Sequence, residues 1–390
     1  MSLIPKADVL VIGGGVIGAS VAFHLAVAGV RRVVLCEQGA IPGCGATRSS
    51  GGLLRMHHTN RWQVQLAWRS FETYSRWADV VGGDCGFRQT GFACIVGREH
   101  ADLLDRNLEM LSGIGVPTLR LSPEEFVRMQ PACSPEQIGA VAYEPFSGYA
   151  DPVLATHWFS QGARQRGAAL LEGVSVIGLL RDGDRVRGAL TSCGEISAGA
   201  VVLAANAGAP RLLKDAGLDV PLQPRRISVC YLSWSRPEKA PALCTCIDDS
   251  LGTYFRPMPA RRVLVGVEWR RSGTENELNV PMNVVEIEEA RSRVSRRVPS
   301  LRDARLAGTS TGVDGYTPDG HAVVGRTPNL EGLYLAVGFS GGGFKVAPAV
   351  GRAVAEELTS GGEAPELGAF RLRRFESGDL IRGQHTYSYM

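Results

Sequence analysis

Residues 8–18, Asp-Val-Leu-Val-Ile-Gly-Gly-Gly-Val-Ile-Gly, decide the fold of this chain of 390 residues. A short, mostly apolar run ends in a G-x-G-x-x-G sequence formed by Gly13, Gly15 and Gly18, and an alanine-rich stretch from Val16 to Ala28 follows. A buried strand, a glycine turn and a helix in this order are typical of the first half of a βαβ unit. We therefore predict a Rossmann-like parallel sheet that begins here.

Each glycine of this turn has its own physical task. Gly13 permits the tight turn, Gly15 lets the backbone approach a pyrophosphate, and Gly18 lets the helix pack closely against the strand. The free N–H groups at the helix N-terminus attract phosphate. A second strand, Arg32–Cys36, ends in Glu37, 24 residues after Gly13, near the spacing of a carboxylate that binds a ribose hydroxyl. The pattern predicts binding of a dinucleotide.

Length and composition exclude several classes of protein. A length of 390 residues corresponds to about two to three domains, and 44% apolar with 21% charged residues is typical of a soluble globular enzyme. No apolar run reaches the roughly 18 residues of a membrane span, and the N-terminal run is too polar and too short for a signal peptide. We expect a cytoplasmic protein. The net charge of +3 predicts no nucleic-acid partner.

The remaining composition has three notable features. The nine cysteines include no C-x-x-C pair and are odd in number, which favours reduced thiols and no metal site. Arginine doublets at 225–226, 261–262 and 270–271 are scattered, and we interpret them as solvated surface. Glycine makes up about 12% of the chain against a usual 7% or so, while lysine occurs only four times.

Further elements follow from periodicity and turn signals. We predict a helix over 61–81 with Ala67, Phe71, Tyr74, Ala78 and Val81 in the core, and one over 283–298 with Val284, Ile287, Val294 and Val298 inward. A helix should begin at Asp151-Pro152, where an N-cap residue precedes a first-turn proline. The predicted strands cover 169–171, 174–176, 185–190, 200–205 and 262–269.

The segment 332–345 is the second informative stretch. A buried strand, Gly332–Val337, leads into the turn Gly341-Gly342-Gly343, and a helix with an early Pro348 follows. Here a second helix N-terminus is free of bulky side chains, which allows close approach of a flat or anionic group.

Four segments together resemble the FAD-dependent oxidoreductases of the D-amino-acid oxidase superfamily, with the sarcosine oxidase and glycine oxidase branch most similar. These segments are the G-x-G-x-x-G sequence with Glu37, the stretch 45–55, the strand that ends in 205–208, and the region from Thr317-Pro318-Asp319-Gly320 to Lys345. They span nearly the whole chain.

The resemblance implies an α/β plus α+β architecture with two interleaved domains. A Rossmann-like FAD-binding domain of the glutathione-reductase type would comprise 1–86, 146–217 and 313–375. A substrate-binding domain on a mostly antiparallel sheet would comprise 87–145 and 218–312, and residues 376–390 would form a C-terminal tail.

The resemblance also assigns residues to the cofactor. Glu37 would bind the adenosine ribose, the Val176 backbone would contact adenine, and the turn 341–345 would donate N–H groups to the flavin pyrimidine end. The implied FAD contacts are Gly13, Gly15, Val16, Ile17, Gly18, Glu37, Gln38, Thr47, Arg48, Ser49, Val176, Ala205, Gly208, Gly338, Gly341, Gly342, Gly343, Phe344 and Lys345.

The implied substrate is an amino acid or related amine, and Arg55 and Lys345 would hold its carboxylate by charge-assisted hydrogen bonds. Tyr254 and Arg256 would face the flavin, whereas His57 and His58 have no assigned role. The implied reaction is hydride transfer from the α-carbon of a neutral amine to flavin N5, which gives an imine and needs no dedicated base. Dioxygen or another acceptor would take the electrons.

Three positions depart from the family pattern. Gly312 and Ser49 stand where related enzymes carry a cysteine or histidine linked to flavin, so we predict non-covalent FAD. Leu264 occupies the place of a lysine that promotes reaction with dioxygen, which leaves oxidase and dehydrogenase open. Asp314 lies where an arginine is usual, and this indicates a substrate larger or more polar than glycine.

Two other functions remain open at the level of sequence. The same fold could oxidise a carbon–oxygen bond as an FAD-dependent 2-hydroxyacid dehydrogenase, or the chain could be a non-catalytic flavoprotein. Lys345 and Arg55 favour an enzyme over the second of these alternatives.

Overall fold

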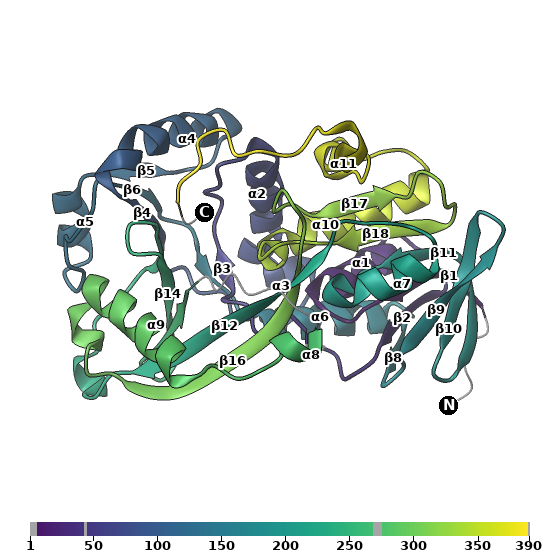
Figure 1. The fold of residues 1–390 in the computed structure, drawn as a ribbon, viewed down its shortest axis with the longest axis horizontal. Coiled ribbons are helices and arrows are strands. Elements are labelled where there is room, and N and C mark those ends of the chain that lie inside the picture. Colours follow the sequence, from purple (N-terminus) through teal and green to yellow (C-terminus); the bar gives the residue numbers. More distant parts are fainter. Residues whose placement is uncertain (1–5, 43–44, 268–274, 389–390) are drawn as a thin grey trace.

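Two eight-stranded sheets form the framework of the molecule (Figure 1). The computed structural model describes residues 6–42, 45–267 and 275–388. The two sheets lie side by side along the long axis, and a small pair of strands, β3 (Leu53–Leu54) and β7 (Gly148–Tyr149), lies between them in sequence and space.

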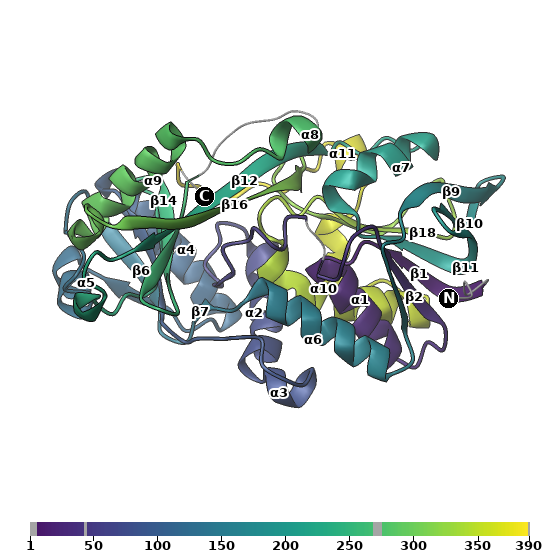
Figure 2. The same cartoon turned by 90° about the horizontal axis from the view of Figure 1, so that it is seen from below.

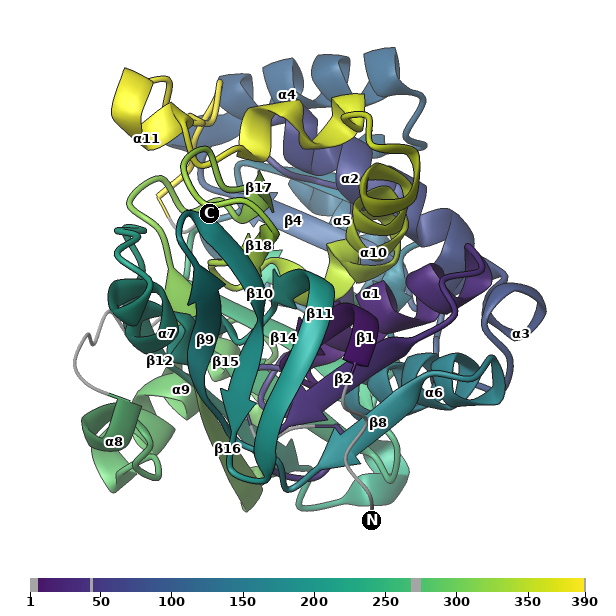
Figure 3. The same cartoon turned by 90° about the vertical axis from the view of Figure 1, so that its right-hand side faces the viewer.

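The first sheet has the strand order β17-β18-β11-β1-β2-β8, and the β9–β10 hairpin continues from β11 (Figure 3). Strands β1, β2, β8, β11 and β18 pair in parallel, whereas β17 pairs antiparallel to β18. The strand bounds are β1 Lys6–Ile12, β2 Val33–Glu37, β8 Ala169–Glu172, β9 Val176–Asp182, β10 Arg185–Thr191, β11 Gly194–Leu203, β17 Val323–Arg326 and β18 Leu333–Val337.

Helices cover both faces of this sheet, which explains why its central strands are apolar throughout. Helix α1 (Val16–Val27) packs between α6 (Pro152–Gln165) and α10 (Gly343–Ser360) on one face, and α2 (Arg61–Ser75) packs on α10 (Figure 2). The opposite face carries α7 (Ala209–Asp215), whose Leu212 and Leu213 join a second buried cluster. The predicted N-cap of α6 is confirmed, since the Asp151 carboxylate accepts hydrogen bonds from the Val153 and Leu154 N–H groups.

The second sheet has the order β16-β12-β15-β14-β13-β4-β6-β5 and is antiparallel except between β13 and β4. Its strands are β4 Phe92–Val96, β5 Leu119–Leu121, β6 Ala140–Glu144, β12 Gln223–Ser233, β13 Thr245–Asp248, β14 Thr253–Met258, β15 Arg262–Gly266 and β16 Arg305–Tyr316. The remaining helices are α3 Trp77–Val80, α4 Ala101–Ile114, α5 Pro123–Met129, α8 Glu275–Leu278, α9 Val284–Arg297 and α11 Arg374–Ser377. No described helix is both long and apolar enough to cross a bilayer.

The mixed architecture confirms the predicted fold class. The division of the chain at 86, 146, 217 and 313 stays a prediction, and β16 runs through the last of these boundaries. Of the predicted strand 262–269, β15 comprises 262–266, and residues 268 and 269 lie outside the described part of the chain.

The predicted helix 61–81 is two helices, and its predicted core residue Ala78 is exposed. Helix α2 ends at Ser75 because Arg76 leaves the helical conformation, with φ −122°. The periodicity therefore loses its phase, and Trp77 takes the buried position instead.

The predicted inward face of α9 is confirmed at Val294 and Val298, which are buried, and at Ile287, which packs against the same cluster, but it is wrong at Val284. Val284, at the first helical position, is 70% exposed, while the buried residues are Glu286, Ala290, Val294 and Arg297. A periodicity of apolar residues cannot detect a face that carries charged groups.

Those charges are neutralised by partners on the sheet. Glu286 forms a buried ion pair with Arg226 at 2.6 Å, and Arg297 forms one with Asp248 at 2.7 Å. The doublet Arg225-Arg226 is therefore not solvated surface, whereas Arg261 is exposed as expected and Arg270-Arg271 lie outside the described residues.

Candidate active site

A cavity of about 440 Å³ is lined by residues of both sheets, and it collects most of the residues singled out in the sequence. Residues from Ile12 to Lys345 contribute to its wall. The predicted site residues that line it are Gly13, Gly15, Val16, Ile17, Glu37, Gln38, Thr47, Ser49, Arg55, Val176, Ala205, Gly208, Tyr254, Gly341, Gly343, Phe344 and Lys345.

The glycine turn after β1 has the geometry expected of it. Gly13 has φ +110°, and a Cβ there would lie 2.6 Å from the Ala204 carbonyl oxygen. A Cβ on Gly18 would lie 1.9 Å from the Gly13 carbonyl oxygen, so Gly18 does not line the cavity but lets α1 approach β1. Gly15 is the N-cap of α1 and has no side-chain cap. The helix N-terminus therefore opens directly onto the cavity.

Glu37 lies at the end of β2 on the cavity wall. Its carboxylate accepts hydrogen bonds from the Gly14 N–H at 2.7 Å and the Gly39 N–H at 3.0 Å. These bonds fix the side chain beside the glycine turn, at the place where the sequence predicts a contact with ribose.

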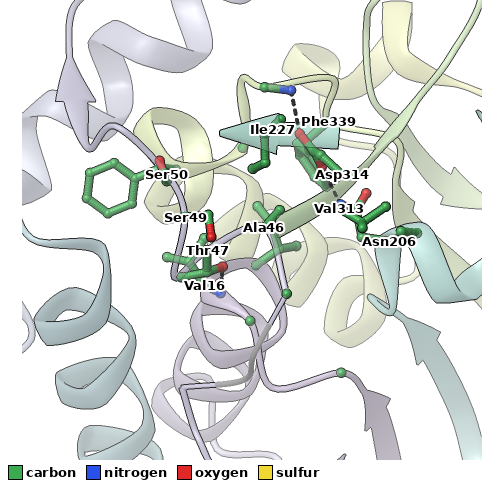
Figure 4. A pocket seen from close by; sticks show the side chains of 18 of the residues that line it. Val16, Ala46, Thr47, Ser49, Ser50, Asn206, Ile227, Val313, Asp314 and Phe339 are labelled. Atoms are coloured by element: carbon green, nitrogen blue, oxygen red, sulfur yellow. Dashed lines mark hydrogen bonds between the residues drawn. The ribbon is translucent and has the colours of Figure 1, made fainter. Parts of the chain in front are cut away.

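The loop 45–52 runs along the middle of the cavity (Figure 4). The Thr47 hydroxyl accepts a hydrogen bond from the Val16 N–H at 3.1 Å, and Ser49 bonds to Ser310 at 2.9 Å. Arg48 is exposed and does not line the cavity, because its neighbours in the turn face inward.

Asp314 organises the far end of the cavity. Its buried carboxylate accepts hydrogen bonds from the Gly341 N–H at 2.7 Å, the Gly315 N–H at 2.9 Å and the Asn206 side-chain amide (Figure 4). Asn206 in turn accepts a hydrogen bond from the Gly338 N–H at 3.1 Å. Burial raises the pKa of Asp314, and these donors and the charge of Lys345 oppose the rise.

The turn 338–342 carries α10, whose N-cap Gly342 has no side-chain cap. Gly343, Phe344 and Lys345, the first residues of α10, line the cavity. The cavity thus joins two helix N-termini whose N-cap residues are glycines, and helix N-termini bind anionic groups. Its length, its glycine walls and these donors fit FAD, whose diphosphate would meet α1 and whose flavin would meet α10.

Arg55 lies deep in the site, between the cavity and the second sheet. Its guanidinium donates to the His57 carbonyl and to Nδ1 of His58 at 3.3 Å, and lies 5.8 Å from the centre of the Phe92 ring. Burial lowers the pKa of Arg55 to about 10. Glu144, on β6, is fully buried and accepts from the Met56 N–H at 3.0 Å, so a carboxylate lies behind this cation.

Lys345 is a second buried cation on the same wall, 8% exposed. Burial, reinforced by the charge of Arg55, lowers the pKa of its ammonium group to about 7, and Asp314 opposes the shift. The ammonium group of Lys345 makes no hydrogen bond or ion pair with any residue in the described part of the chain.

Tyr254 and Arg256 follow one another on the same face of β14 but lie differently. Tyr254 lines the cavity, and its ring fits only because residue 266 is glycine, where a Cβ would lie 1.9 Å from the ring. Arg256 is not on the wall: it donates to the Gly51 carbonyl at 2.5 Å and lies 4.3 Å from the centre of the Tyr149 ring. Arg256 thus supports the loop that lines the cavity.

Several wall residues are not among the predicted site residues, and the interpretation of the doublet Arg225-Arg226 as solvated surface is wrong. They include Ala46, Ser50, Asn206, Arg225, Arg226, Ile227, Ser228, Val313, Tyr316 and Phe339. Most lie on β12 and β16, whose pairing brings positions about 90 apart in sequence together, and no local pattern marks them. Among the described residues, no group of three or more metal-ligating side chains is suited to a metal ion.

The model of the DAO family, described as FAD dependent oxidoreductase, matches residues 8–357. The chain therefore belongs to this family of FAD-dependent oxidoreductases, which confirms the resemblance, the cofactor and the enzyme class expected from the sequence.

Curated relatives differ in length. The chain is 27% identical over 381 residues to 4-methylaminobutanoate oxidase (formaldehyde-forming) of Paenarthrobacter nicotinovorans, covering 94% of this chain but 45% of that enzyme. It is 28% identical to glycine oxidase of Geobacillus kaustophilus, covering 95% and 97%. The chain thus spans less than half of the first relative and nearly all of the second.

Among solved structures, L-proline dehydrogenase from P. horikoshii is similar over most of its length. Its TM-score is 0.88 at 30% identity, with 96% of this chain and 99% of that chain covered.

Proposed function

We propose that this enzyme oxidises the carbon–nitrogen bond of an amino acid or a related amine that carries a carboxylate. The named relatives act on glycine, L-proline and a methylaminobutanoate, so a carboxylate and an amine nitrogen are common to their substrates. This agreement supports the reaction class predicted from the sequence, whether the substrate amine is secondary, cyclic or that of a D-amino acid.

One observation carries the proposal: half-buried Arg55 and buried Lys345, 290 positions apart, line the same cavity, and the charge of Arg55 helps to lower the pKa of Lys345. Glu144 lies near Arg55 and Asp314 near Lys345, but among the described residues neither carboxylate forms an ion pair with these cations, so both cations can bind an anion that enters the cavity. A substrate carboxylate is such an anion, and it would restore the pKa of Lys345 toward its ordinary value. We assign both residues to carboxylate binding, with Arg55 able to make a bidentate contact.

The other residues of the site shape the cavity and hold the segments that face the cofactor and the substrate. When bound, FAD supplies the acceptor for the hydride that leaves the substrate carbon. Asp314 holds the turn that carries Lys345, and Tyr254 narrows the cavity beside the carboxylate. Arg256 holds Gly51 in the loop that faces the cofactor. The amine proton needs no dedicated base if the substrate binds in its neutral form.

We further propose that FAD is bound without a covalent link. Gly312 is packed against Ser49, where a Cβ would lie 2.9 Å from the hydroxyl oxygen, so neither position offers a thiol or an imidazole. Leu264 is buried on β15, at the place where related oxidases carry a lysine that promotes reaction with dioxygen. The electron acceptor can therefore be dioxygen or another compound. The free cysteines of the described chain accord with a cytoplasmic location.

The direct test is anaerobic mixing of the FAD-loaded enzyme with N-methyl, cyclic, and D- and L-amino acids and with 2-hydroxyacids. We expect amines with a carboxylate to bleach the flavin absorbance, and Arg55→Ala and Lys345→Ala to raise the concentration required by about tenfold or more. Lys214→Ala, a change at an exposed lysine, is the matched control. Bleaching by hydroxyacids alone, or by nothing, would overturn the proposal.

A further inference from the structure

The C-terminal segment 381–388 crosses from the first sheet to the second over the side of the molecule that carries α2 and α4 (Figure 1). Four hydrogen bonds hold it along its length. The Ile381 N–H donates to Asp319 at 3.1 Å, and Asn60 donates to the Arg382 carbonyl at 3.1 Å. Then the Gln384 N–H donates to the Thr59 carbonyl at 2.8 Å, and Asn107 donates to the His385 carbonyl at 2.8 Å.

This segment ends in a buried aromatic side chain. Tyr387 is 6% exposed and joins the apolar cluster of Phe92 and Leu104, although the residues on either side of it are exposed. Its hydroxyl accepts a hydrogen bond from Asn107 at 2.7 Å. Ile381, 7% exposed, and Tyr387 are the two buried residues of this segment, and Tyr387 anchors its end at the second sheet.

Tyr387 contacts His57, the residue that fixes Arg55. The two rings are stacked, with centroids 5.9 Å apart and planes 12° apart, and Nε2 of His57 lies 3.0 Å from the tyrosine hydroxyl. The His57 carbonyl in turn accepts the hydrogen bond of the Arg55 guanidinium. The same guanidinium lies over Phe92, a member of the cluster that Tyr387 completes. Tyr387 therefore contacts His57 and shares a buried cluster with Phe92, which are two of the three groups around the Arg55 guanidinium; the third is His58.

The charge state of His57 favours a constant contact between its ring and Tyr387. Burial and the neighbouring Arg55 lower the pKa of His57 to about 3, so its ring is neutral in the folded protein. A neutral ring adds no charge beside Arg55, and its stacking with Tyr387 is independent of pH over the ordinary range. Arg55 can then keep its charge for a ligand on the cavity side.

We propose that segment 381–388 is a positioning strap and that Tyr387, acting through His57, holds Arg55 in the orientation that binds a carboxylate. Tyr387 is a positioning residue, since it touches neither the cavity nor the reacting atoms. The inference rests on the proposed function, because it takes Arg55 to be the carboxylate ligand.

The test measures binding of benzoate, a carboxylate without an oxidisable amine, to the FAD-loaded enzyme through the change in flavin absorbance. We expect Tyr387→Phe, which keeps the ring, to raise the Kd about twofold to fivefold, and Tyr387→Ala to raise it about tenfold or more. FAD content should stay at the wild-type level. Thr386→Ala, a change at the exposed neighbour, is the matched control and should leave the Kd unchanged.

A double-mutant cycle separates positioning from general loosening. If Tyr387 acts through Arg55, then Tyr387→Ala should add less than about twofold to the Kd of Arg55→Lys. If Tyr387→Ala raised the Kd by the same factor in the wild-type enzyme and in Arg55→Lys, Tyr387 would act independently of Arg55, and the strap would be overturned. A normal Kd for Tyr387→Ala together with a raised Kd for Arg55→Lys would also overturn the strap, but it would leave the proposed function intact. A normal Kd for Arg55→Lys would instead overturn the carboxylate site itself.

Discussion

Lys345 combines its proposed role in carboxylate binding with a penalty for folding. Its pKa is about 7 in the folded protein and near 10.5 in the unfolded chain, because burial disfavours the ammonium form. Between these values the unfolded chain holds a proton that the folded protein lacks, so stability rises with pH across this window. Below pH 7 both states are protonated and the full penalty remains.

We therefore expect Lys345→Met to raise the free energy of unfolding by about 1 to 3 kcal/mol at pH 6, with a smaller gain at pH 10, while substrate affinity falls. Thermal unfolding at the two pH values measures the first effect and flavin bleaching the second. A variant that is less stable at pH 6 would contradict the assignment of Lys345 as a buried, unpaired cation.

The same titration should appear in ligand binding. A carboxylate binds the protonated ammonium group, so the Kd for benzoate should be lowest below pH 7 and rise by up to about tenfold per pH unit above it. Arg55, with a pKa of about 10, stays charged throughout pH 6–9. Flavin absorbance titrations across that range provide the measurement. Lys345→Gln should flatten the profile, and an unchanged profile in this variant would place the titrating group elsewhere.

At the scale of elements, the close contact between β1 and α1 depends on Gly18. A Cβ there would meet the Gly13 carbonyl oxygen at 1.9 Å, and neither backbone can move without disturbing the sheet. We expect Gly18→Ala to destabilise the protein by about 1 to 3 kcal/mol or more and to lower the FAD content of the purified enzyme. Gly368→Ala, where a Cβ meets nothing within 4 Å, should change neither. The two variants are compared by their FAD content, measured from flavin absorbance, and by their melting temperatures.

The βαβ unit was predictable because the residues that determine its backbone geometry lie close together in the sequence. Gly13, Gly18 and Glu37 lie within 25 positions, and each acts on the backbone beside it. The burial of Glu286 on the inward face of α9 was not predictable, because its partner Arg226 lies about 60 positions away in the sequence. In the sequence alone, the two members of a buried ion pair cannot be distinguished from two solvated charged residues, because their contact depends on the tertiary structure.

At the scale of the whole molecule, the cavity wall combines β1, β12, β16 and α10, so a bound cofactor would contact elements of both sheets. We expect removal of FAD to lower the melting temperature, because a ligand at a thousand times its Kd contributes about 4 kcal/mol to stability. Thermal unfolding with added riboflavin is the control: it lacks the diphosphate that the α1 terminus would bind and should restore little stability. Full recovery with riboflavin would contradict the placement of the diphosphate at α1.

The site was only partly predictable at this scale for the same physical reason. Lys345 and Arg55 belong to motifs that the sequence shows, but Asp314 holds the turn at Gly341 through a contact that no spacing in the sequence predicts. Tyr387 is more distant still, since it reaches Arg55 only through His57, 330 positions away. Long-range pairing, rather than residue type, decides which polar groups meet.

The strand order has a consequence for the synthesis of the protein on the ribosome. Strand β1 is made first and lies in the middle of its sheet, but its neighbour β11 begins only at residue 194. At about 5 to 20 residues per second, one edge of β1 waits roughly ten to forty seconds for its partner. An apolar strand edge left open in this way can pair with another nascent chain. The yield of folded protein should therefore depend on how well the cell shields the growing chain, more than on the stability of the finished enzyme.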